Sequence, residues 1–242
     1  MAVLFLLTLL QDAPCRGEAA GRIVNAMRLS QAFDLSGAAM EYAAAADAGC
    51  ADAEVVVQYL RGLVAARAAD AQFGSPESLQ SVRRAAAALE SRGKTDSNAR
   101  VAHAVLRAAI PAAQHERAEM ALMIDEMLRL EGVQLEAGLP GLPAITAHEA
   151  AGQFWLQNRA WDEAARAFDE AARRIGTTPH VLLGSARAAA GRAETAAACG
   201  QYAKLLTWWA DRPAPPPEVA EAQAYVKQPQ CAPPAARPGT KR

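Results

Sequence analysis

The stretch that decides the fold covers residues 146–209 and reads TAHEAAGQFWLQNRAWDEAARAFDEAARRIGTTPHVLLGSARAAAGRAETAAACGQYAKLLTWW. Residue types mark where helices begin. Thr146 and Glu149 match a capping box, in which each side chain accepts a hydrogen bond from the backbone of the other residue. Thr178 and Pro179 suit an N-cap followed by the first helical position. We expect four helices over about 147–158, 161–175, 179–190 and 193–210.

The same stretch repeats itself with an offset of 32 residues, which aligns Gly152 with Gly184 (184 − 152 = 32). The offset also aligns Ala164 with Ala196 and Ala171 with Ala203. Small residues at these places let two antiparallel helices approach closely, while large side chains fill the spaces between them. Since one helical hairpin cannot bury its own apolar face, the repeat predicts stacked hairpins.

At these residues the chain resembles the tetratricopeptide repeat family. The resemblance covers roughly residues 146–209, with the following helix as a cap. Gly200 departs from the family pattern, because it stands where Phe168 supplies an aromatic in the first unit, and His148 and His180 replace the opening Trp. The resemblance implies an α-solenoid of antiparallel hairpins that binds a protein or peptide on its concave face and is not an enzyme.

By analogy with that family, the first helix of each unit lines a partner-binding groove. The candidate groove residues are Glu149, Gln153, Leu156, Gln157, Val181, Ser185 and Ala188. They do not supply the Lys and Asn with which some family members grip the C-terminal peptides of chaperones. The alternative interpretation is that these positions are ordinary solvated helix faces.

The rest of the chain is also predicted to be helical. Hydrophobic residues make up 52% and aromatic residues only 5%, and abundant Ala, Leu, Arg and Glu favour helices over strands. We therefore predict an all-α protein in four parts. They are a helical-hairpin region over 18–138, a Pro/Gly linker over 139–144, repeats with a capping helix over 145–227 and a disordered tail over 228–242. Within the first part we expect a helix over 98–130 that is broken or kinked at Pro111, with a Met-rich face that packs in the core.

Charge and motifs narrow the possible functions. The net charge of −1 leaves no broad basic field for nucleic acid. No HExxH, GxSxG, CxxC or phosphate-loop spacing occurs, so we expect no metal, no cofactor and no catalytic activity. Two alternatives stay open. One is an accessory subunit of a cell-envelope assembly complex, and the other is an enzyme whose site, without a linear motif, lies among the helices of 18–138.

The N-terminal residues MAVLFLLTLL bear on localisation. Ten apolar residues are too few to span a membrane but suit a signal peptide over 1–17, so we expect export to the periplasm or cell surface of a bacterium. A buried first helix in a cytoplasmic protein is the alternative. Cys50 and Cys199 are each expected to be a buried thiol more often than half of a disulfide. If the chain is exported, Cys15 can pair with Cys50, or Cys231 with another cysteine.

Overall fold

The computed structural model describes residues 15, 17–72, 74–210 and 215–231, and within these ranges the chain is all-helical, without a β-strand. Eleven α-helices and two short 3-10 helices follow one another along the described residues. They are α2 (Glu18–Gln31), α3 (Leu35–Asp47), α4 (Ala53–Ala71), α5 (Pro76–Glu90), η1 (Arg92–Lys94), α6 (Ser97–Ala113), α7 (Arg117–Glu136), α8 (Ala147–Gln157), α9 (Trp161–Ile175), α10 (Pro179–Gly191), α11 (Thr195–Trp209), α12 (Pro217–Val226) and η2 (Pro229–Cys231).

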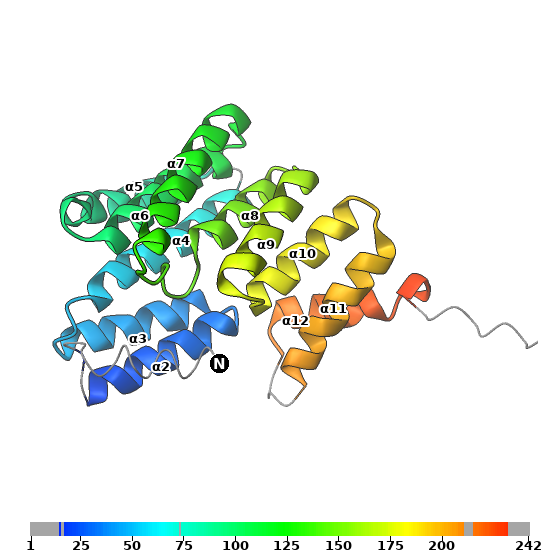
Figure 1. Cartoon of the computed structure of the whole chain (residues 1–242), viewed down its shortest axis with the longest axis horizontal. Helices are drawn as coiled ribbons and strands as arrows, with labels where there is room; N and C mark the ends of the chain where they lie inside the picture. The colour runs from blue at the N-terminus through cyan, green and yellow to red at the C-terminus, as the bar shows by residue number, and fades with distance from the viewer. Residues whose placement is uncertain (1–14, 16, 73, 211–214, 232–242) are drawn as a thin grey trace, which may run out of the picture.

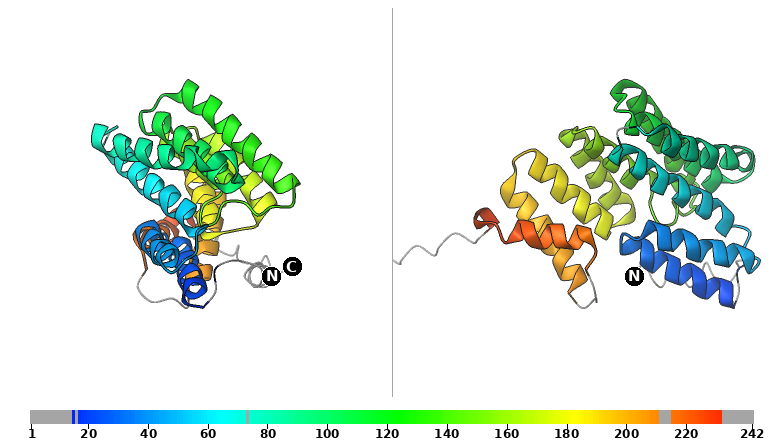
Figure 2. Two further views of the ribbon diagram at one scale, coloured as in Figure 1. Left: turned by 90° about the vertical axis from the view of Figure 1, so that its left-hand side faces the viewer. Right: turned by 180° about the vertical axis from the view of Figure 1, so that it is seen from behind.

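The helices pack as consecutive antiparallel hairpins (Figure 1). The pairs are α2–α3, α4–α5, α6–α7, α8–α9 and α10–α11, and α12 packs on α11. Each hairpin also packs on the next one, and α4, α6, α8 and α10 contact one another in that order. Seen from behind, the chain forms an arch in which the first hairpin and the last helices return to the same side (Figure 2).

One hydrophobic core crosses the expected domain boundary. Its buried residues run from Cys15 to Phe154, so α8 shares a core with α6 and α7. Leu142 and Ile145 in the non-helical linker are buried in the same core. The Pro/Gly stretch therefore ends α7 as expected, but it does not separate two independent cores.

The repeat is built around one aromatic ring. Phe168 of α9 is fully buried, and its ring fills the space left by Gly152 of α8 and Gly184 of α10. A Cβ on Gly152 would lie 2.6 Å from Cζ of this ring, which is closer than two carbon atoms can approach. The 32-residue offset between these glycines thus corresponds to close packing of three helices.

The break expected at Pro111 is present, but it lies just after the proline, since α6 ends at Ala113 and α7 begins at Arg117. Pro111 lies in the last turn of α6, and the chain breaks only after it, where His115 adopts a φ of 59°. A proline near the end of a helix costs one backbone hydrogen bond and does not require a bend there. The Met-rich face expected in the core is confirmed, since Met120 and Met127 of α7 are fully buried.

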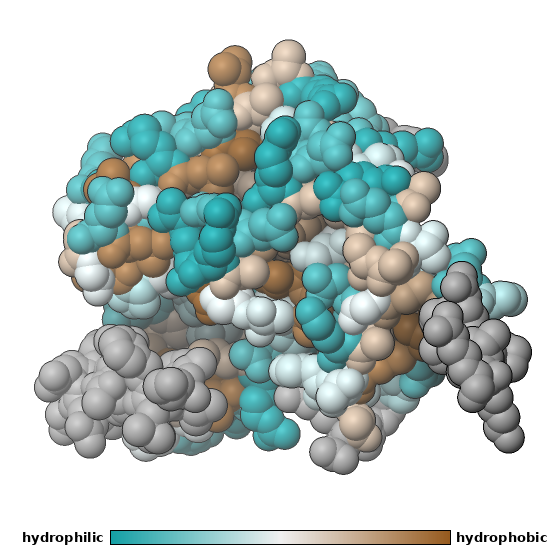
Figure 3. Space-filling view, turned by 45° about the vertical axis from the view of Figure 1, so that its right-hand side comes forward, coloured by the Kyte–Doolittle hydropathy of each residue, from teal (hydrophilic) through white to brown (hydrophobic). Residues whose placement is uncertain are grey.

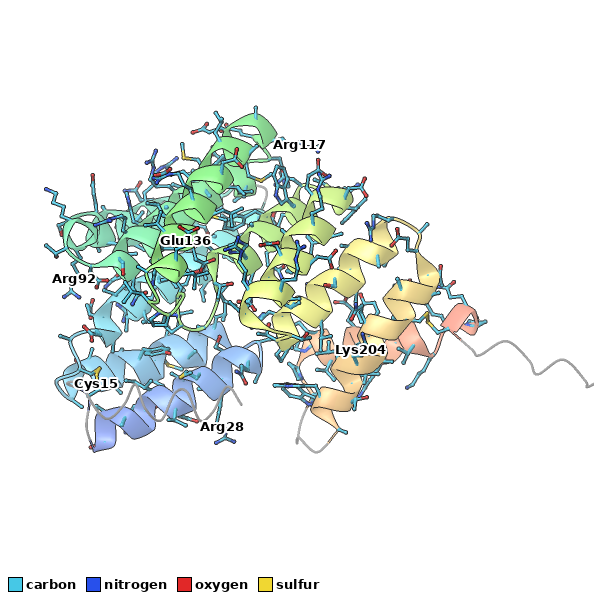
Figure 4. All side chains as sticks on the ribbon, in the orientation of Figure 1. Cys15, Arg28, Arg92, Arg117, Glu136 and Lys204 are labelled. Carbon is cyan, nitrogen blue, oxygen red and sulfur yellow. A yellow bond between two sulfur atoms is a disulfide. The ribbon has the colours of Figure 1, made fainter. Side chains whose placement is uncertain are left out.

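Disulfides join Cys15 to Cys50 and Cys199 to Cys231, with Cα atoms 4.8 and 5.5 Å apart. The expectation of buried thiols is therefore wrong, whereas the pairing of Cys15 with Cys50, left open by the sequence, is present beside the end of α3 (Figure 4). The second disulfide ties η2 to α11, so the chain is ordered to Cys231, beyond the expected start of the tail at 228. The rest of the tail and most of the expected signal peptide lie outside the described residues.

Candidate binding pocket

A pocket with a volume of about 370 Å³ lies between α4, α8, α10, α12 and the turn before α3. Its lining residues are Phe33, Arg67, Asp70, Gln153, Leu156, Gln157, His180, Leu183, Arg187 and Glu218. A narrow extension of about 30 Å³ continues from it between α3, α4 and α8. Pockets of a few hundred Å³ are large enough for a small ligand or a few side chains of a partner.

The α8 wall offers free hydrogen-bonding groups. Gln153 and Gln157 are one helical turn apart and half-buried, and both line the pocket. Neither side chain forms a hydrogen bond within the described part of the chain. Each carboxamide can therefore donate and accept hydrogen bonds with a bound molecule.

Arg67 of α4 is one of the charged residues that line the pocket. Arg67 is solvent-exposed, yet the surrounding protein removes enough water to lower the pKa of the guanidinium, and nearby Arg187 lowers it further. Glu218 acts in the opposite direction. Among the described residues, no carboxylate forms an ion pair with Arg67.

Arg187 on α10, unlike Arg67, has a carboxylate partner. Its Nε and Nη2 atoms donate to the two carboxylate oxygens of Glu221 at 3.0 and 2.5 Å. The hydroxyl of Tyr202 donates to the same carboxylate at 2.6 Å. Burial alone would lower the pKa of Arg187, but the hydrogen bonds to Glu221 raise it. This arginine is therefore part of the scaffold that holds α12 against α10 and α11.

His180, in the first turn of α10, also lines the pocket. It is buried, and its Nε2 lies 2.8 Å from the carbonyl oxygen of Ser30. Because a carbonyl only accepts, Nε2 carries the proton and donates. Burial lowers the pKa of His180 to about 4, so the imidazole is neutral at pH 7. Its contacts attach the end of α2 and the following turn to α10.

A second group of ionisable residues lies deeper and caps helices. Glu131 accepts from the backbone N–H groups of Ala147 and His148 at 2.8 and 3.2 Å and lies 2.5 Å from Nδ1 of His148. Glu149 accepts from the Thr146 backbone at 2.9 Å and from the Thr178 hydroxyl at 2.5 Å. Burial raises the pKa of Glu149, although these hydrogen bonds oppose the rise. Both carboxylates thus serve to cap the start of α8, and Glu149 also contacts Thr178, the residue before α10.

The structure brings part of the expected groove together. Gln153, Leu156 and Gln157 line the pocket, and Glu149 lines its narrow extension while engaged in the cap. The three expected residues of α10 do not line the pocket: Val181, Ser185 and Ala188. Of these, Val181 and Ala188 are buried in the core. The pocket face of α10 is one residue away from the face that the repeat alignment gives, a rotation of about 100° around the helix axis.

Other parts of the chain cover the first turns of α8 and α10, whereas the expected groove would leave these turns open to a partner. Residues 147–152 and 179–184 are all buried. The turn at Phe33 and helix α4 from the N-terminal half provide part of this cover. In α8 only the second half reaches the pocket, whereas α10 contributes His180, Leu183 and Arg187, so the accessible surface is a pocket rather than a long groove.

Sequence reasoning missed Arg67 and Glu218. A signal for Arg67 was present, because the apolar stripe of α4 at Val56, Leu60 and Leu63 continues to position 67 at helical spacing. A charged residue on a core-facing stripe either snorkels to water or faces a cavity. No comparable signal marks Glu218, whose position depends on how α12 packs.

Comparisons with protein-family models, with curated proteins and with solved structures find no match to this chain. In the described ranges, no group of three or more His, Cys, Asp and Glu side chains is arranged to hold a metal ion. No helix in those ranges has both the length and the hydrophobicity to cross a membrane. The space-filling view shows a face on which hydrophilic residues surround smaller hydrophobic patches (Figure 3).

Proposed function

We propose that this chain is a non-enzymatic interaction module, a tetratricopeptide-like α-solenoid that binds a short segment of a protein or peptide partner in the pocket. The observation that carries the proposal is the pair of unpaired glutamines on α8, Gln153 and Gln157, which face a cavity built from the first helices of the hairpins. Carboxamides at one-turn spacing suit the alternating donors and acceptors of a peptide backbone.

The size of the pocket limits the segment. Because the first turns of α8 and α10 are covered, a helix laid along the whole concave face does not fit. A cavity of about 370 Å³ accommodates two or three residues. The pocket is preformed by packed helices, so little ordering entropy is lost on binding.

The two disulfides support a location outside the cytoplasm, because such bonds persist in oxidising compartments. We therefore propose an exported adaptor, and a partner within a cell-envelope assembly complex fits the same site. A signal peptide cleaved after residue 17 would remove Cys15, so the disulfide with Cys50 is kept only if any cleavage lies on the N-terminal side of Cys15.

The test is co-purification. The protein, tagged at its C-terminus and expressed in its source organism, is expected to retain a partner at near-stoichiometric level. The double variant Gln153→Arg/Gln157→Arg should lose that partner. A matched control, Gln80→Arg/Gln223→Arg, adds the same charge at exposed positions outside the pocket and should keep it. Recovery of no partner, or equal loss in both variants, would overturn the proposal.

A further inference from the structure

Two residues of opposite charge line the pocket from different helices without forming an ion pair with each other. Arg67 lies on α4 and Glu218 in the first turn of α12. Neither forms an ion pair or a side-chain hydrogen bond within the described residues. Their fields nevertheless reach each other, because Glu218 opposes the lowering of the Arg67 pKa.

The neighbouring charges in this pocket have partners. Arg187 is held by Glu221, and Asp70, which also lines the pocket, faces His115 with 3.8 Å between Oδ1 and Nε2. Burial raises the pKa of Asp70, and His115 opposes that rise. Arg67 and Glu218 are thus the two lining charges left without a partner, and together they carry no net charge.

Leaving two charges unpaired in a partly desolvated pocket costs free energy. An alternative packing in which the two side chains meet would recover part of it. The helices α4 and α12 are instead held apart by the cores on which each packs. The space between the charges is therefore set by the packing of the two helices, and a ligand with charges of both signs can contact both residues.

We propose that the pocket is a binding site for a dipolar ligand group, with a carboxylate held by Arg67 and an ammonium or guanidinium held by Glu218. Gln153 and Gln157 hydrogen-bond the polar atoms between the two charges, and Leu156 and Leu183 contact the carbon chain. The site excludes phosphate and other multiply charged anions, because Glu218 and Asp70 repel them. It also disfavours simple amines, which Arg67 and Arg187 repel.

This inference rests on the proposed function of the pocket as a binding site, and it specifies the chemistry of the bound group. Two sources supply that chemistry: a free amino acid with separated charges, or a peptide segment in which an acidic and a basic side chain lie close together. Both present one carboxylate and one cation, and the experiment below distinguishes them.

The experiment titrates the full-length, disulfide-bonded protein with defined probes at low ionic strength. The small-molecule probes are glycine, 4-aminobutyrate and 6-aminohexanoate, compared with butyrate and butylamine. The peptide probes are acetyl-Asp-Gly-Lys-amide and its neutral-acid analogue acetyl-Asn-Gly-Lys-amide. Binding is followed by calorimetry and by the side-chain Nε–H resonances of arginine. We expect at least one dipolar probe to bind roughly tenfold more tightly than the singly charged compounds, as two charge-assisted contacts predict.

Variants identify the groups responsible. Arg67→Gln and Glu218→Gln should each weaken the dipolar probe by about tenfold. The controls are Arg61→Gln on another face of α4 and Glu119→Gln in the first turn of α7, both exposed, and they should change nothing. The double variant Arg67→Glu/Glu218→Arg should regain binding, because the ligand can bind in the reverse orientation. A merely structural role of either residue would not produce this rescue.

The outcomes separate the two proposals. Equal binding of butyrate and 4-aminobutyrate, or the same loss in Arg61→Gln as in Arg67→Gln, would overturn the dipolar site. A partner that co-purifies unchanged with Arg67→Gln but is lost with the glutamine variant would overturn it while sustaining the interaction module. Probe binding that depends on Arg67 and Glu218, without any co-purifying protein, would sustain the dipolar site alone and indicate the free amino acid as ligand.

Discussion

The ring of Phe33 meets the imidazole of His180 edge to face, with ring centroids 4.7 Å apart. This contact joins the turn between α2 and α3 to the first turn of α10, far along the chain. It is reinforced by the hydrogen bond from His180 to the Ser30 carbonyl. The first hairpin therefore contacts the second half of the chain through His180, whose imidazole is neutral at pH 7 because burial lowers its pKa to about 4.

The buried His180 should make stability depend on pH. Its pKa is about 4 in the folded protein and about 6.5 in an unfolded chain. Between these values the unfolded chain binds more protons, so the free energy of unfolding is greatest above pH 6.5 and falls as the pH drops towards 4. The shift corresponds to roughly 3 kcal/mol at most. Urea unfolding of the oxidised protein at a series of pH values measures it.

The control for this prediction is His180→Gln, which keeps a side-chain amide that can donate to Ser30. Its free energy of unfolding should vary less between pH 6.5 and 4 than that of the natural protein. Glu149 does not produce the same trend, because its raised pKa favours the folded state as the pH falls. Parallel pH profiles for the two proteins would contradict the role given to His180.

Gly184 should not tolerate a methyl group. A Cβ there overlaps the ring of Phe168, which is fully buried and cannot move away. Gly184→Ala is expected to lower the free energy of unfolding by about 1–3 kcal/mol, as overpacking does. The matched variant is Gly200→Ala in α11, where a Cβ meets nothing within 4 Å, and it should stabilise the protein by roughly 0.5–1 kcal/mol. Chemical denaturation of both variants tests the contrast, and effects of the same sign would refute it.

Glu131 should be among the most sensitive carboxylates, because it is fully buried and caps the start of α8. Glu131→Gln keeps the shape but replaces one acceptor oxygen by a donor that faces N–H groups. We expect a loss of about 2–4 kcal/mol in the free energy of unfolding. Glu126→Gln on the same helix breaks only an exposed pair with Arg129 and should change stability by less than about 1 kcal/mol. Similar losses in the two variants would contradict a capping role.

Both disulfides should form in the mature protein. Peptide mapping without reduction is expected to recover Cys15 linked to Cys50 and Cys199 linked to Cys231, with no free thiol among the four. Cys231→Ser should lower the free energy of unfolding by about 2–4 kcal/mol, since it releases a loop of moderate length. Recovery of Cys50 as a free thiol would show that the N-terminal cysteine is removed during processing.

The repeat stretch allowed local structure to be predicted well. The capping box at Thr146 and the N-cap at Thr178 are both present with their hydrogen bonds. Such signals act within one helical turn and need no knowledge of the rest of the fold. Ser75 precedes α5 in the same way, but its side chain forms no cap hydrogen bond there.

The pocket could be predicted only in part, because its other walls come from distant segments. Gln153 and Gln157 were found by analogy with the tetratricopeptide repeat family, in which the first helix of each unit lines the groove. The contribution of Phe33 depends on a turn in which this residue adopts a φ of 66°, and the contribution of Glu218 depends on the placement of α12. Neither placement is encoded by local periodicity, because both result from closure of the arch.

The packing of Phe168 against Gly152 and Gly184 constrains how these three positions can evolve. A smaller residue at 168 would leave a void that a side chain at 152 or 184 could fill, whereas a side chain at either glycine first requires a smaller residue at 168. The three positions are therefore constrained to vary together. Homologues of this chain should show correlated substitutions among them, with one bulky residue shared by the group of three.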